Sequence, residues 1–205
     1  MAYRSLEPVT WRVRAIAGGG RTVADTRRAL LLLRGDAPPA YAFPEADVDA
    51  AAVAGDAWRG VDDAPGYVLL ADAAIEGILE EDEPLLGHPR NPYHRADAIA
   101  SSRRVRVELA GAVLAESTRP LALFETGAPT RFYLAQADVR LDLLEPSATV
   151  TTSPYLGRAV WFSARIAGEL HEDIAWTYRF PIAQMPRLAG LLAFRDELVR
   201  ELSPP

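Results

Sequence analysis

Residues 151–178 of the chain read TTSPYLGRAVWFSARIAGELHEDIAWTY, and the fold is predicted from this stretch. Apolar and polar residues alternate on either side of two glycine-containing turns, at Gly157 and Gly168. Alternation with period two is typical of strands that pair across short turns and bury one face. The stretch also holds two of the four tryptophans, two tyrosines and a histidine. It therefore predicts the centre of an antiparallel β domain and the best place to look for a small-molecule site.

The alternation also predicts which side chains share a face. In residues 158–166, the side chains of Val160, Phe162, Ala164 and Ile166 are expected inside, and Trp161 on the opposite face. In residues 173–178, Ile174, Trp176 and Tyr178 are expected on one face and Asp173 on the other. Further strands are predicted at 103–109, 112–116, 121–125, 131–134 and 190–194, and short helices at 137–144 and 196–202.

An internal repeat extends the prediction to the whole chain. Residues 20–48 align without a gap with residues 111–139, and ten of the 29 aligned positions are identical. Composition alone would give roughly two or three identities, so the match indicates a duplication. We therefore expect a mainly β chain of two tandem domains with a few short helices. Residues 1–95 form a degenerate first repeat with its connector, and residues 96–205 form a second repeat with the better-formed motif set.

The composition excludes several classes of chemistry. The chain has no cysteine and no lysine, which excludes thiolate nucleophiles, thiolate metal sites, Schiff bases and a phosphate-binding lysine. The net charge of −6 argues against nucleic acid as a partner. A leader and a membrane-length apolar run are not found, so we expect a cytoplasmic protein. His88 and His94 lie six residues apart but lack a third ligand, so neither a metal nor a cofactor is predicted.

The second repeat resembles a bacterial family known as domain of unknown function 427. The resemblance covers most of residues 103–195, through RVRVELAGAVLAEST at 104–118, FET at 124–126, APTRFYLAQADV at 128–139, TTSPYLGRAVWF at 151–162, DIAWTY at 173–178 and GLLAF at 190–194. It implies a β-tent fold, in which two sheets meet at an angle around a pocket, and it implies no established activity. A label of nucleotidyl transfer is attached to the family, but the sequence lacks a Gly-Ser motif with paired aspartates for two metals.

Two positions depart from the family pattern. Ser153 and Leu156 stand where family members commonly have a cysteine and a lysine. Any thiol or amine chemistry of relatives is therefore lost here. Some other β-tent folds hold ligands in an aromatic cage, and by analogy the tyrosines and tryptophans of the second repeat could form one.

The leading hypothesis is a module that binds an unknown small molecule in an aromatic pocket of the second repeat. The predicted walls are Tyr133, Tyr155, Trp161, Trp176 and Tyr178, and the predicted polar anchors are Arg104, Glu125 and Asp173. An alternative is a metal-independent hydrolase or transferase that uses Asp and Glu with His171, which requires these groups to converge. A third possibility is an interaction protein that forms a homodimer through an exposed tryptophan face.

Overall fold

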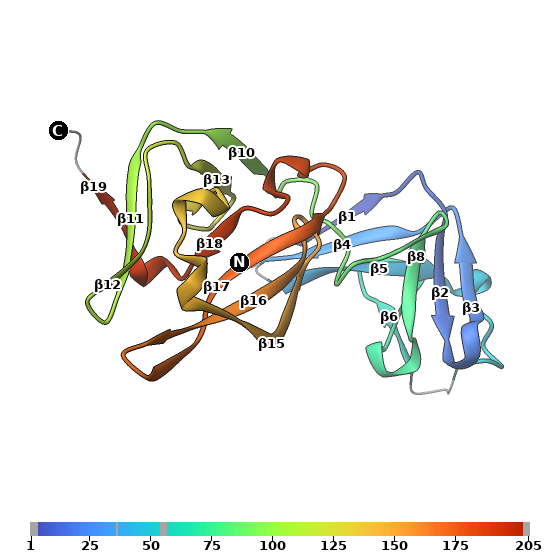
Figure 1. Ribbon diagram of the computed structural model, residues 1–205. Coiled ribbons are helices and arrows are strands. Elements are labelled where there is room, and N and C mark those ends of the chain that lie inside the picture. Colours follow the sequence, from blue (N-terminus) through green and yellow to red (C-terminus); the bar gives the residue numbers. More distant parts are fainter. Residues whose placement is uncertain (1–3, 36, 54–56, 203–205) are drawn as a thin grey trace. The chain divides into compact units, whose positions relative to one another are not determined.

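A computed structural model of the chain describes residues 4–35, 37–53 and 57–202 (Figure 1). The chain forms two compact units, Met1–Asn91 and Pro92–Pro205. The predicted mainly β fold is confirmed: the described residues form several antiparallel sheets, and their helices are short 3-10 turns. None of these helices is long and apolar enough to cross a membrane.

The first unit contains two sheets. Its strands and turns are β1 (Arg4–Pro8), β2 (Val13–Ala17), η1 (Gly18–Gly20), β3 (Arg21–Thr26), β4 (Leu30–Arg34), β5 (Ala37–Pro44), η2 (Glu45–Asp47), β6 (Trp58–Val61), β7 (Ala64–Leu70), η3 (Asp72–Ala74), β8 (Gly77–Glu80) and β9 (Glu83–Pro84). The larger sheet has the order β1-β4-β5-β7-β6 and the smaller one β3-β2-β8-β9. Buried side chains of β2, β3, β4 and β5 form most of the main core. In β2 the buried residues alternate with partly exposed ones, whereas β4 and β5 are apolar on both faces.

The second unit contains three sheets. Its elements are β10 (Ala96–Ala100), β11 (Arg104–Leu109), β12 (Ala112–Ser117), β13 (Leu121–Glu125), β14 (Arg131–Tyr133), η4 (Gln136–Asp138), η5 (Leu141–Leu143), β15 (Leu144–Ser153), β16 (Gly157–Ile166), β17 (Glu169–Pro181), η6 (Pro186–Leu188), β18 (Leu192–Phe194), η7 (Asp196–Leu198) and β19 (Val199–Leu202). The sheet orders are β10-β13-β14, β12-β11-β19 and β15-β16-β17-β18. Residues 151–178 thus supply most of the long central hairpin, β16 and β17.

The two units share spacing and pairing at an offset of 91 residues. Strand β13 begins and ends 91 residues after β4, and turn η4 lies 91 residues after η2. The isolated bridge between Ala24 and Val48 recurs between Ala115 and Val139. Both units place a buried hydroxyl after the hairpin: Thr26 and Ser117 each accept a hydrogen bond from the backbone N–H two residues later.

The central hairpin of the second unit is buried on both faces. Phe162, Ala164 and Ile166 pack in one core, with Val105 and Phe194, as their predicted orientation requires. Trp161 and Trp176 pack in a second core with Leu123 and Leu188. Trp161 is therefore half-buried instead of forming an open tryptophan face.

Irregular pairing explains where the alternation misleads. Val160 was expected inside but is only half-buried. The register between β16 and β17 shifts between Phe162 and Ala164, so the side-chain alternation is interrupted there. Ile174 consequently packs in a different core from Trp176 and Tyr178, and the prediction that the three share a face is wrong.

The two predicted helices have different outcomes. Residues 137–144 contain parts of the turns η4 and η5, which agrees with one or two helical turns. The helix predicted at 196–202 is wrong beyond its first turn, η7, because residues 199–202 form β19. That strand pairs with β11, from Val107↔Val199 to Arg104↔Leu202, so a sheet edge decides the conformation.

Candidate functional site

Three of the predicted wall residues form the buried floor of an aromatic cluster in the second unit. Tyr133 is the last residue of β14, and Trp176 and Tyr178 occupy alternate positions of β17, which places them on one face of the strand. Their exposed fractions are 0%, 7% and 6%. Because they are packed in the core, these three side chains give the cluster a rigid base.

The polar atoms of this floor bind one another. The Trp176 indole N–H donates to the Tyr133 hydroxyl at 3.4 Å, and the Tyr133 and Tyr178 rings lie 6.3 Å apart between centroids. Burial raises the pKa of Tyr133 to about 12. Burial also raises the pKa of Tyr178. Both phenols are therefore neutral at physiological pH and act as hydrogen-bonding groups.

A second layer of side chains covers this floor. Trp161 lies 4.8 Å from Trp176 between ring centroids, and its indole N–H donates to the Thr151 hydroxyl at 2.9 Å. The Arg131 guanidinium lies 5.1 Å from the Trp176 ring and pairs with Asp196 at 3.2 Å. A guanidinium over an indole is a favourable cation–π contact. Arg131 was not a predicted site residue. It lies two residues before Tyr133 in β14, and this position places it in the cluster.

Glu125 borders the same cluster through a histidine. The Nε2 atom of His94 lies 3.0 Å from Glu125 Oε1, and the His94 ring stacks on Tyr155 at 4.0 Å with an interplanar angle of 24°. The side chains of His94 and Glu125 are largely covered, with exposed fractions of 21% and 16%. The sequence interpretation assigned His94 to the connector alone. Its position six residues after His88 gave no sign of the contact with Glu125, which comes from strand β13.

Two predicted anchors, Arg104 and Asp173, have other partners. Arg104 is exposed and pairs with Glu116 across the hairpin of β11 and β12. Asp173 accepts a hydrogen bond from the Thr149 hydroxyl at 2.7 Å, and its backbone N–H donates to Ser163 at 3.1 Å. The hydroxyls of Ser147 and Thr149 lower the pKa of Asp173. The side chain of Asp173 thus fixes the irregular part of β17.

The groups required for the catalytic alternative do not contact one another among the described residues. Glu125 binds His94, Asp173 binds Thr149, and His171 lies on β17 opposite Ala164. The Nε2 atom of His171 is buried and has no hydrogen-bond partner in the described part of the chain. Within that same part, no cluster of three or more His, Cys, Asp or Glu side chains could hold a metal ion.

The structure therefore brings together six of the eight predicted site residues and adds His94 and Arg131.

The comparison with known proteins concerns the same part of the chain. A family model described as "Domain of unknown function (DUF427)" matches residues 97–203, which is slightly more than half of the chain and nearly all of the second unit. The chain matches no curated protein. The length of the family match shows that the chain belongs to the DUF427 family.

Proposed function

We propose that the second unit binds a small organic molecule without covalent chemistry, at the half-buried edge of its aromatic cluster. The observation that carries the proposal is the set of Glu125, His94, Tyr155 and Trp161 beside a fully packed floor. Small-molecule sites are usually lined by aromatic and apolar side chains with a small number of polar groups, and this edge has both kinds of side chain.

The side chains at this edge define the class of ligand. Glu125 offers a carboxylate that accepts hydrogen bonds, and His94 already holds one of its oxygens. Tyr155 and Trp161 offer partly exposed rings for stacking. We therefore propose a ligand with an aromatic or apolar body and at least one hydrogen-bond donor, from which the Glu125 carboxylate would accept a hydrogen bond.

We also propose that the two units are tandem copies of one ancestral domain, of which the second retained the family motifs. The offset of 91 residues supports this, because it relates strands β4 and β13 and the bridges Ala24↔Val48 and Ala115↔Val139. The family match reaches only the second unit. The first copy would then have diverged beyond recognition by the family model while it kept the pairing pattern.

Ligand screening tests the binding proposal. The full chain is screened against a metabolite collection by thermal shift, since a ligand that binds only the folded state raises the melting temperature. Glu125→Gln keeps the shape of the site but removes the charge, and Trp161→Ala removes a ring at the edge. Leu141→Ala is the matched control, because Leu141 lies in the same unit, in turn η5, and is 45% exposed. We expect a hit whose stabilisation disappears in the first two variants and persists in the third.

A hit that survives both Glu125→Gln and Trp161→Ala would place binding elsewhere and contradict the proposal. Each variant must first show a cooperative unfolding transition without ligand, so that lost binding is separated from lost structure. Trp176→Ala is unsuitable for this purpose, because removal of a buried tryptophan typically costs about 3–5 kcal/mol.

The interaction alternative rests on one different observation. Phe180, near the end of β17, is 89% exposed, although most large apolar side chains of the unit are covered. We propose it as the first contact to test for self-association. Sedimentation of the wild type and Phe180→Asp over a range of concentrations would decide, and a monomer at every concentration would remove this alternative.

A further inference from the structure

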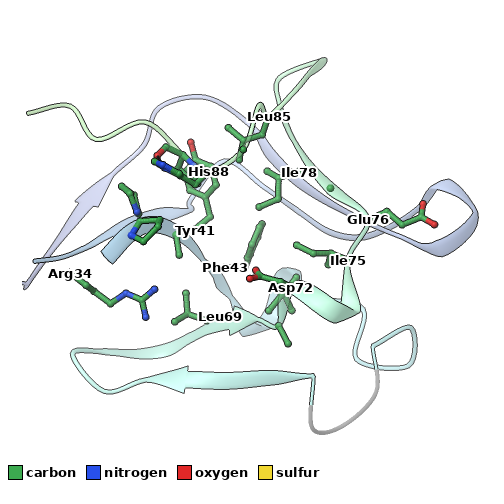
Figure 2. A pocket seen from close by; sticks show the side chains of 18 of the residues that line it. Arg34, Tyr41, Phe43, Leu69, Asp72, Ile75, Glu76, Ile78, Leu85 and His88 are labelled. Atoms are coloured by element: carbon green, nitrogen blue, oxygen red, sulfur yellow. Dashed lines mark hydrogen bonds between the residues drawn. The ribbon is translucent and has the colours of Figure 1, made fainter. Parts of the chain in front are cut away.

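The first unit holds a cavity at the place where two strands of its larger sheet stop pairing. Strand β5 pairs with β7 only through Phe43↔Val68 and Pro44↔Tyr67. Other residues of both strands line a cavity of about 810 Å³, whose apolar surface includes Leu69, Ile75 and Ile78 (Figure 2). This volume lies within the range of about 300–1,000 Å³ that is usual for small-molecule sites.

The second unit fills the corresponding place with an ion pair. There the contact between β14 and β18 is the bridge Leu134↔Leu192, and Leu134 stands 91 residues after Phe43. Beside this bridge, Arg131 reaches Asp196, the first residue of turn η7, at 3.2 Å. The guanidinium of Arg131 therefore spans the space between the strand and the turn.

The first unit keeps the acid but not the arginine. Asp72 is the first residue of turn η3, and Asp196 is the first residue of turn η7. Turn η3 precedes β8, which pairs with β2, and turn η7 precedes β19, which pairs with β11; β2 and β11 are each the first strand of a hairpin. The residue 91 positions before Arg131 is Ala40, and both Ala40 and Asp72 line the cavity. No ion pair or side-chain hydrogen bond joins Asp72 to a described residue. The short alanine thus leaves a space where a cation would face Asp72.

A buried donor without a partner lines the same cavity. The Nε–H of Arg34 is buried and has no hydrogen-bond partner in the described part of the chain, and Arg34 forms no ion pair there. A buried donor without a partner is rare because leaving it unsatisfied is costly. Figure 2 shows the guanidinium group of Arg34 directed toward Leu69, with Asp72 on the other side of Leu69. A guanidinium binds a carboxylate with two parallel hydrogen bonds, so an anionic ligand group would satisfy Arg34.

The other polar side chains of the lining are engaged or exposed. The Tyr41 hydroxyl donates to Glu80 at 2.6 Å and accepts from the Trp11 indole at 3.1 Å, and burial raises the pKa of Tyr41. The Nδ1 atom of His88 lies 2.8 Å from the Pro89 carbonyl oxygen. The carboxylate of Glu76 points away from the centre of the cavity in Figure 2, and Arg59 is exposed. Asp72 is exposed, as Arg59 is, but it occupies in η3 the position that Asp196, the partner of Arg131, occupies in η7. Arg34, with its buried donor, and Asp72 are therefore the charged groups best placed to hold a ligand.

We propose that this cavity binds a small zwitterion of the amino-acid type. Its carboxylate faces Arg34, its cationic amino or guanidino end takes the place that Arg131 occupies in the second unit, and its apolar chain lies on Leu69. The site is independent of the aromatic cluster in the second unit.

Calorimetric titration of the full chain tests the proposal with three probes. L-Arginine carries both charged ends, agmatine lacks the carboxylate, and pentanoate lacks the cation. We expect L-arginine to bind about tenfold or more tightly than either of the others, because each lost charged hydrogen bond weakens binding by about that factor. Arg34→Gln should weaken L-arginine binding about tenfold or more and should not weaken agmatine binding. Asp72→Asn should weaken L-arginine binding about tenfold or more and should not weaken pentanoate binding.

Two further variants make the test specific. Arg27→Gln changes the charge equally at an exposed position of the same unit outside the cavity lining, and should alter the affinity by less than about twofold. Ala40→Arg should abolish binding without a loss of melting temperature, because the new side chain can pair with Asp72 as Arg131 pairs with Asp196. The Trp161→Ala variant should bind L-arginine as the wild type does, which separates this site from the one proposed in the second unit.

Clear results would overturn the proposal. If the wild type binds none of the three probes at millimolar concentration, the cavity is not a site for such zwitterions. If Arg34→Gln and Arg27→Gln weaken L-arginine binding equally, the effect is one of net charge. If Ala40→Arg fails to fold, Arg34→Gln and Asp72→Asn still decide the outcome, because neither side chain makes an ion pair or a side-chain hydrogen bond with another described residue.

Discussion

Replacement of Gly157 by alanine should destabilise the second unit strongly. Gly157 is the first residue of β16 and pairs with Pro181, and its φ of +118° lies in a region that other residues rarely adopt. A Cβ atom there would lie 3.1 Å from Pro181 Cα, 3.2 Å from the Ile182 nitrogen and 3.2 Å from the Phe180 carbonyl oxygen. All three are backbone atoms, so none can turn away as the end of a side chain could.

The expected magnitude follows from two costs and one offset. The unfavourable φ costs about 1–2 kcal/mol, and the overpacking adds about 1–3 kcal/mol. The lower entropy of the unfolded alanine variant offsets about 0.4–1 kcal/mol. We therefore expect a net loss of about 1–5 kcal/mol in the free energy of unfolding. The Ile182 N–H donates to the Leu156 carbonyl at 3.1 Å, so the shift should also move the neighbouring Tyr155 at the edge of the aromatic cluster.

Gly168 supplies the matched control. It lies in the same unit with a φ of +88°, but a Cβ atom there would have no neighbour within 4 Å. Gly168→Ala therefore measures the cost of the backbone conformation alone, about 1 kcal/mol or less after the entropic offset. Urea unfolding followed by tryptophan circular dichroism reports on the second unit, because the rings of Trp161 and Trp176 lie 4.8 Å apart in a tilted contact. If Gly157→Ala costs no more than Gly168→Ala, the backbone contacts at Gly157 carry no energetic weight and the reasoning is refuted.

Three other predictions concern the second unit. Tyrosine ionises at about pH 10 in the unfolded chain, whereas the pKa of Tyr133 in the folded chain is about 12. The free energy of unfolding should therefore fall by up to about 3 kcal/mol as the pH rises between these two values, and the fall should be smaller in denaturation of Tyr133→Phe. Asp173→Ala should cost about 1–3 kcal/mol, because it loses the bond from Thr149 and keeps a φ of +51°, and Asp173→Gly should recover part of this loss. Since the pKa of Asp173 is lowered, its contribution is present above the ordinary carboxyl pKa and lost as the pH falls below it, so acid denaturation should become less steep in Asp173→Asn. Leu114→Ala should cost about 2–5 kcal/mol by chemical denaturation, because Leu114 is fully buried.

The strand pattern could be predicted because it depends on local alternation. Val105 and Val107 alternate with charged residues in the sequence, and both are fully buried in β11. The conformation of residues 199–202 could not be predicted in the same way. Their apolar spacing also fits a helical turn, and only the free edge of β11 makes them a strand.

The packing of the aromatic cluster was predictable where residue type alone restricts the location. Tyrosine and tryptophan on one strand face, such as Trp176 and Tyr178, pack together wherever that strand is placed. Arg104 and Asp173 lie with other partners because a charged residue goes to whichever partner the fold supplies, here Glu116 and Thr149. The place of Asp173 in the strand also depends on irregular pairing, which disturbs the alternation used to assign its face.

The differences between the two repeats carry more information about sites than their similarities do. At the offset of 91 residues, Arg34 corresponds to Glu125 and Ala40 to Arg131, so charge is exchanged at one position and lost at another. In the second unit Glu125 is held by His94 and Arg131 by Asp196, and the aromatic cluster is compact. In the first unit Arg34 has no acidic partner among the described residues, Asp72 has no basic one, and the cavity lies between the strands. Two copies with opposite charge at one position cannot prefer the same ligand, because a carboxylate that binds Arg34 would be repelled by Glu125. On the proposed duplication, the exchange therefore argues that the first copy changed its specificity, since a copy kept only for stability would gain by closing the cavity and pairing both charges.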